Sequence, residues 1–422
     1  MYFEKITTRD HNRYYFHMCI ISLLLSILWV LFINSVPFSD FDYYYNLAKH
    51  IANGGKWGDT YTSVGYAIVL GGVFKIFGAS VMVGKTFNIV LTLINNVLFY
   101  NILNCVNLNK RDKKIIFTLF VLFPNNIFYN SILCTEILFT CILLLTTLVY
   151  FKDIKYKYII MGILTGINSL VKPFFIVIFF GVFIVEVLKN KKFTKAFMKS
   201  MTILIVSLIT ISPWIYRNTK YIGEFTSISN NGGIVLYINN NSTNNMGRWM
   251  PSDNVENSIT VTDKYKSSNR TQQNKMLSQA AKKWIVNNPK RFMELGFKRL
   301  YNTYFLGDDI GYSIYGSGLS SAASHKLFII TNIIRNIIFI PGIIGILAYS
   351  IYVIVMIFKN KTQNLNKCSL FFLILYYMFT CVYFVTEGQS RYSFPIIFVM
   401  IYSFYFTFKN VFSYFTNKEN LL

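Results

Sequence analysis

Long apolar segments dominate this chain and limit what it can fold into. A transmembrane helix needs about 20 predominantly apolar residues, and stretches of this kind recur along the whole sequence. Of the 422 residues, 54% are hydrophobic and 14% are charged, whereas a soluble domain carries about 25% charged residues. We therefore predict an all-α polytopic membrane protein.

The apolar segments are numerous enough for a bundle of about ten transmembrane helices. We place these helices near residues 15–37, 79–105, 115–131, 133–151, 157–171, 173–189, 199–216, 327–358, 368–386 and 393–411. The first segment is too long for the apolar region of a signal peptide, and no small-residue cleavage site follows it. We expect it to be a retained helix.

The net charge of +23 comes largely from short lysine-rich loops, among them residues 110–114, 189–199 and 359–367. Such loops favour the cytoplasmic side, where they also face anionic membrane lipids. We therefore predict an integral protein of a bacterial plasma membrane with both termini in the cytoplasm. Because the basic residues lie between membrane helices, the charge does not indicate a nucleic-acid partner.

The same topology leaves two larger segments outside the cytoplasm and divides the chain into three parts. Residues 1–216 form an N-terminal transmembrane module with a first outer loop at 38–78. Residues 217–326 form a large extracytoplasmic loop or cap, and residues 327–422 form the C-terminal transmembrane helices. Both outer segments contain short apolar or amphipathic stretches, for which we predict interfacial helices.

Carboxylates at the predicted outer surface are the first candidates for chemistry. Asp40 and Asp42 follow the first apolar segment, and Glu136 precedes a purely apolar helix. An outer carboxylate can act as a general base or hold a divalent cation, and ionisable residues within a membrane are costly and usually functional. The alternative is that these acids only cap helices or interact with helix dipoles.

Three cations fall at outer helix ends by the same topology: Lys172, Arg217 and Arg391. Positive residues on the outer side run against the positive-inside rule, and arginine in particular can bind a phosphate through two parallel hydrogen bonds. The alternative for Arg391 is a side chain that only extends to the membrane interface. Carboxylates and cationic side chains suited to bind phosphate thus lie together on the predicted outer face. This combination indicates a lipid-phosphate substrate outside the cytoplasm.

A series of short motifs, in order along nearly the whole chain, resembles the GT-C glycosyltransferases. The similarity is to the branch of protein O-mannosyltransferases and the lipid A aminoarabinose transferase. The matching segments are residues 39–44, 65–78, 135–139, 162–173, 230–240 and 391–395. In the first, Tyr44 follows Asp40 by four residues; the last contains Arg391, Tyr392 and Pro395. Residues 61–64 depart from the family, because they lack its prolines and its phosphate-binding lysine.

The resemblance implies an inverting glycosyltransferase with a GT-C-like helix bundle. Its donor would be a sugar on a polyprenyl phosphate, and its acceptor would be a glycolipid, an envelope polymer or a protein. Asp40 would act as the general base, and Glu136 would position the acceptor or, with Asp40, a divalent cation such as Mg²⁺ or Mn²⁺. Arg391, Lys172 and Arg217 would contact the donor phosphate, with Asp42, Tyr44 and Tyr392 as secondary site residues.

Other functions stay open at this point. A lipid-linked glycan polymerase or ligase usually carries its motifs in one large late loop rich in arginine and histidine, whereas the acids of this chain come early. A transporter or flippase places its site near the midplane on broken helices, which this sequence does not clearly show. A membrane scaffold would not need Asp40, Glu136 and Arg391 together.

Overall fold

The computed structural model describes residues 2–419, which form helices and connecting loops with no strand among them. The α-helices are α1 (Tyr2–Phe32), α2 (Ser39–Ala52), α3 (Gly65–Phe77), α4 (Val81–Cys105), α5 (Lys110–Val121), α6 (Pro124–Phe128), α7 (Thr135–Phe151), α8 (Lys157–Val171), α9 (Ile178–Asn190), α10 (Phe193–Ile222), α11 (Gly232–Asn239), α12 (Asp263–Ser267), α13 (Arg270–Asn287), α14 (Pro289–Tyr304), α15 (Ile310–Ser313), α16 (Ser321–Phe358), α17 (Lys367–Val385) and α18 (Ile397–Glu419). Six short 3-10 helices join them: η1 (Tyr129–Ser131), η2 (Pro173–Val177), η3 (Ser252–Asn254), η4 (Ile259–Val261), η5 (Thr362–Asn364) and η6 (Ser390–Ile396).

The predicted class, an all-α polytopic membrane protein, is confirmed. Within the described residues, 7 helical segments are long and apolar enough to cross a membrane, and α7 and α8 are shorter apolar helices. The prediction of one continuous helix over 115–131 is wrong. Here α5 ends at Val121 and Pro124 begins α6, because proline cannot continue a helix but fits its first turn.

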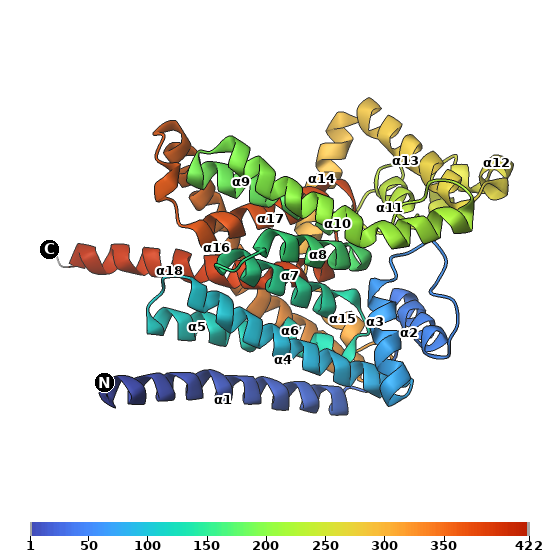
Figure 1. The fold of residues 1–422 in the computed structure, drawn as a ribbon. Coiled ribbons are helices and arrows are strands. Elements are labelled where there is room, and N and C mark those ends of the chain that lie inside the picture. The colour runs from blue at the N-terminus through green and yellow to red at the C-terminus, as the bar shows by residue number, and fades with distance from the viewer. Residues whose placement is uncertain (1, 420–422) are drawn as a thin grey trace.

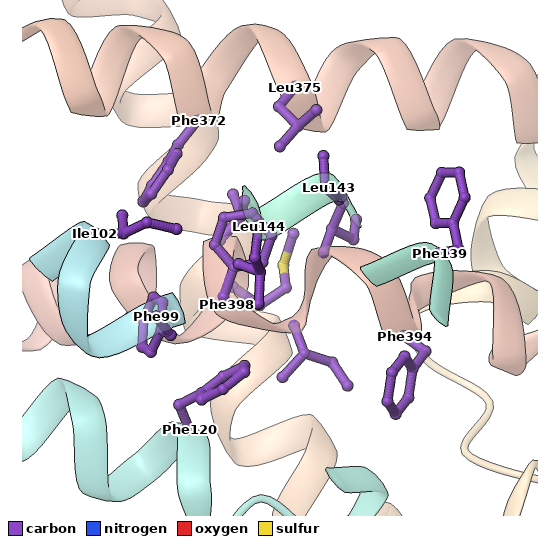
Figure 2. Packing of buried hydrophobic residues seen from close by; sticks show 14 of the residues in the cluster. Phe99, Ile102, Phe120, Phe139, Leu143, Leu144, Phe372, Leu375, Phe394 and Phe398 are labelled. Atoms are coloured by element: carbon purple, nitrogen blue, oxygen red, sulfur yellow. The ribbon is translucent and has the colours of Figure 1, made fainter. Parts of the chain in front are cut away.

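Helix α7 forms the centre of the bundle. Leu143 and Leu144 of α7 are fully buried and lie among aromatic side chains of the surrounding helices (Figure 2). These neighbours include Phe99 on α4, Phe372 on α17 and Phe398 on α18. A helix enclosed on all sides needs apolar residues all round, which accounts for the composition of α7.

Two glycines allow α8 to pack closely against α10. A Cβ atom added at Gly162 would lie 2.6 Å from Cβ of Val206, and one added at Gly166 would lie 2.6 Å from Cβ of Thr210. Small residues four positions apart let two membrane helices approach closely. This contact fixes the end of α8, where the predicted site residue Lys172 follows.

The two chain ends lie at one end of the bundle, and α2, α3 and α11–α13 lie at the other (Figure 1). Lysines make two cross-links at the first end: Lys409 of α18 pairs with Asp112 of α5 at 2.5 Å, and Nζ of Lys191, after α9, donates to the carbonyl of Asn360, after α16, at 2.6 Å. The lysine-rich loops and the termini thus share one end, as predicted. The side of the membrane on which this end lies stays a prediction.

The predicted cap packs on its own small core and is joined to the rest of the protein by polar contacts. Tyr237 of α11 and Leu277 of α13 are buried in this core. At its edge, the backbone N–H of Asn230 donates to the carbonyls of Thr60 at 2.8 Å and Tyr61 at 3.1 Å. The matched loop segment 230–240 therefore holds the cap against the first outer loop.

Candidate active site

Asp40 lies in the first turn of α2, at the end of the bundle opposite the termini. The preceding Ser39 has a φ of 49°, in the left-handed region that non-glycine residues seldom adopt. The N-cap residue is Phe38, which makes no side-chain capping bond. The helix-capping alternative for Asp40 is therefore wrong, and its carboxylate is directed elsewhere.

The partner of Asp40 is Arg391. Nη2 of Arg391 lies 3.0 Å from Oδ2 of Asp40, and the side chains are 14% and 54% exposed, respectively. Arg391 stands in η6, directly before α18, and its guanidinium also lies over the ring of Phe41 at 5.5 Å. The largely buried guanidinium of Arg391 thus holds the half-exposed carboxylate of Asp40 at the surface.

Glu136 and Lys172 form a second, more buried ion pair. Nζ of Lys172 lies 3.2 Å from Oε1 of Glu136, and the two side chains are 15% and 2% exposed. Pro173 follows Lys172, and a proline drives the residue before it out of the helical conformation. Lys172 accordingly ends α8 with φ −136° and ψ 107°, which brings its side chain to the start of α7.

One tyrosine ring joins the two ion pairs. The ring of Tyr392 lies 5.4 Å from Nζ of Lys172 and 5.2 Å from the guanidinium carbon of Arg391. Both Glu136 and Asp40 act electrostatically on Arg391. Tyr44 belongs to the same region, because burial and the charge of Asp40 raise the pKa of its phenol. Six of the predicted residues and their surroundings thus form one site.

Several polar atoms at this site have no partner among the described residues. They are Nε of Arg391 and the hydroxyls of Tyr66 and Tyr383, all buried. Tyr383 stacks on Tyr392 with ring centroids 5.3 Å apart, and Tyr66 packs against Tyr44 at 5.6 Å. Because buried polar groups are normally hydrogen-bonded, these atoms are suited to a ligand that accepts hydrogen bonds.

The sequence reasoning missed Glu387 as a site residue, although it stands in the turn before Arg391. Glu387 is 4% exposed; it accepts hydrogen bonds from the hydroxyl of Tyr392 at 2.8 Å and from Nε2 of Gln389 at 2.5 Å. The sequence could have indicated it, because Glu387 is a carboxylate in the short predicted turn that also contains Arg391. Its contacts fix the ring that joins the two ion pairs.

Two predicted residues are not brought into this cluster. Asp42 is exposed, and its side chain makes no hydrogen bond or ion pair among the described residues. Arg217 contacts neither Arg391 nor Lys172; its Nη1 donates to the carbonyl of Asp59 at 3.3 Å and to the side chain of Asn218 at 2.9 Å. A role for Arg217 at the donor phosphate stays a prediction.

Asp40 and Glu136 are also the predicted ligands of a divalent cation. In the part of the chain that the structure describes, no three His, Cys, Asp or Glu residues gather as a ligand set. Asp40 and Glu136 are each paired with a protein cation instead. Mg²⁺ and Ca²⁺ sites need several oxygen ligands, and a divalent cation at Asp40 and Glu136 stays a prediction.

The fold has known counterparts. No protein-family model and no curated protein matches the sequence. Two solved structures of the archaeal oligosaccharyltransferase AglB from Archaeoglobus fulgidus match 97% of the chain with TM-scores of 0.51 and 13% identity. One contains an inhibitory peptide and a dolichol-phosphate, and the other a tethered acceptor peptide with the NVT sequon.

The chain shares its overall fold with these AglB structures. It spans about half of AglB, 52% and 51% of the two matched chains. At 13% identity the likeness concerns the fold alone. It agrees with the helix bundle expected from the motifs, whereas membership of the GT-C glycosyltransferases and of the mannosyltransferase-like branch stays a prediction.

Proposed function

We propose that this protein is an inverting glycosyltransferase that moves a sugar from a polyprenyl-phosphate donor to an acceptor hydroxyl. The observation that carries the proposal is the Asp40–Arg391 pair, in which Arg391 keeps a buried Nε that has no partner within residues 2–419. A carboxylate is suited to accept a proton, and a guanidinium with a free donor is suited to bind phosphate. The pair joins both functions in one site.

The reaction is a single displacement. Asp40 accepts the proton of the acceptor hydroxyl, and the hydroxyl oxygen attacks the anomeric carbon of the sugar. The bond between this carbon and the phosphate oxygen breaks, and the lipid phosphate leaves with the electron pair. Arg391 and Lys172 stabilise the charge that develops on the phosphate, while Glu136 holds Lys172 at 3.2 Å.

The same proposal places the site outside the cytoplasm of a bacterial plasma membrane. The shared end of the lysine-rich loops and the termini supports this orientation, since Asp40 lies at the opposite end. The acceptor is a glycolipid, an envelope polymer or a protein. The acceptor peptide in one AglB structure favours including peptides among the acceptors that are tested.

The test uses the full chain reconstituted in vesicles with radiolabelled polyprenyl-phosphate sugars. We expect free polyprenyl phosphate to appear together with a labelled acceptor, with and without EDTA. Comparison of envelope glycans, glycolipids and surface proteins from cells with and without the gene identifies the acceptor. A chain that consumes nucleotide sugars but no lipid-linked sugar would contradict the proposal.

A further inference from the structure

A pocket lined by aromatic rings and two cations lies at the C-terminal end of α10. It encloses about 320 Å³ and is lined by Lys56, Trp57, Trp214, Arg217 and Tyr221. The first two residues belong to the loop after α2, and the other three belong to α10. None of the five takes part in the Asp40–Arg391 or Glu136–Lys172 pairs. The pocket is therefore separate from the candidate active site.

Arg217 is held rigidly in this pocket. Its guanidinium carbon lies 4.8 Å from the ring of Trp214 and 5.2 Å from that of Tyr221. Nη2 donates to the carbonyl of Gly58, and Nη1 donates to the carbonyl of Asp59 at 3.3 Å. Stacking and backbone contacts fix the group while leaving its charge without a carboxylate partner.

The two cations of the pocket are not neutralised by the protein. Among the described residues, neither Lys56 nor Arg217 forms an ion pair. The carboxylate of the adjacent Asp59 accepts instead from the backbone N–H of Tyr61 at 2.9 Å. A guanidinium and an ammonium beside aromatic rings are suited to an anion, above all a phosphate.

The surroundings favour a lipid over a soluble anion. Tryptophan and tyrosine are enriched where a membrane meets water, and Trp57 is 51% exposed. Trp57 lines the pocket beside Arg217 and Lys56, so the two cations stand at the depth where lipid head groups meet water.

We propose that this pocket binds the phosphate group of an anionic lipid in the outer leaflet, at a site separate from the donor phosphate. The inference rests on the orientation given under the proposed function. The loop from Lys56 connects α2, which carries Asp40, to Thr60, which accepts from Asn230 of the cap. A bound lipid therefore stabilises the connection between the catalytic helix and the cap.

Native mass spectrometry of the purified full-length chain tests the inference by binding alone, so it is independent of whether sugar transfer is found. The chain is offered phosphatidylglycerol, phosphatidylcholine or inorganic phosphate at matched concentrations. We expect preferential retention of phosphatidylglycerol. Loss of one cation in Lys56→Gln or Arg217→Gln should weaken phosphatidylglycerol binding about fivefold. The control variant Lys283→Gln, which replaces an exposed lysine of α13, should bind it as the wild type does.

Because Arg217 also supports the loop, Lys56→Gln is the decisive variant; its exposed side chain makes no hydrogen bond among the described residues. Equal retention of phosphatidylcholine, or unchanged retention in Lys56→Gln, would overturn the inference. Competition by inorganic phosphate would assign the pocket to a soluble anion. One-for-one displacement by polyprenyl phosphate would make it the donor site, and so would also overturn the inference.

Discussion

The carboxylate of Asp40 accepts a hydrogen bond from Nη2 of Arg391 at 3.0 Å, although 351 residues separate them. This contact joins the first outer loop to the turn before the last helix. It also places a potential base beside a potential phosphate ligand, a combination that a capping aspartate or an interfacial arginine would not need.

Asp40→Asn should abolish sugar transfer without unfolding the protein. General-base catalysis contributes about 10²–10⁴-fold, and the Asp40 side chain is 54% exposed, so its ion pair adds little to stability. Initial transfer rates and thermal unfolding in detergent check both parts. Asp42→Asn is the matched comparison, because Asp42 lies on the same helix and its side chain has no partner among the described residues. This variant should remain active, and equal loss in both variants would remove the assignment of Asp40.

The Glu136–Lys172 pair should matter for stability as well as for donor use. Removing one partner of a buried pair costs about 3–5 kcal/mol, and these side chains are only 2% and 15% exposed. We expect Glu136→Gln and Lys172→Met each to lower the unfolding temperature, and the double variant to recover much of it while staying inactive. Recovery of activity in the double variant would contradict a role at the phosphate.

Glu186 provides a control for the stability part of that experiment. Its side chain is 2% exposed and lies 2.5 Å from Nζ of Lys199, at the end of the bundle with the termini. Glu186→Gln should lower the unfolding temperature in the same way. Because Glu186 lies away from the candidate active site, the folded fraction of this variant should keep the wild-type Michaelis constant for the donor.

The helical bundle could be predicted from apolar segments, because membrane helices leave a strong local signal. The break at Pro124 was missed, since proline is tolerated within some membrane helices and local patterns do not show which case applies. Asp40, Glu136, Lys172 and Arg391 were predicted as site residues from their positions at helix ends that the topology places outside. Their pairing could not be derived, because contacts across hundreds of residues depend on tertiary packing.

Arg217 also shows that the position of a residue in the sequence does not reveal its contacts. Its place at an outer helix end matches that of Lys172, and the sequence gives no way to separate the two. In the structure, Lys172 extends toward Glu136, whereas Arg217 stacks on Trp214 in a different pocket. Helix ends identify the surface on which a residue lies, but neighbouring loops decide which site it joins.

Glu387→Gln should weaken donor use through the position of Tyr392. Hydrogen bonds to charged groups contribute about 1.5–3 kcal/mol, so losing the bond at 2.8 Å should lower kcat/KM about tenfold or more. Tyr392→Phe removes the same bond, and the double variant should lose little more than either single variant. Donor titrations of the three variants measure this coupling; fully additive losses would show that Glu387 acts independently of Tyr392.

The adjacent glycines of the cap motif should differ sharply in their tolerance of substitution. A Cβ atom at Gly233 would collide with the backbone carbonyl of Asn274 on α13, whereas one at Gly232 meets no atom within 4 Å. Gly233→Ala should therefore push α11 away from α13 and cost about 1–3 kcal/mol, with a loss of activity because this loop also anchors the first outer loop. Gly232→Ala should leave unfolding temperature and transfer rate near the wild-type values. Equal tolerance of both substitutions, measured by thermal unfolding and transfer assays, would show that close packing of α11 on α13 does not hold the cap in place.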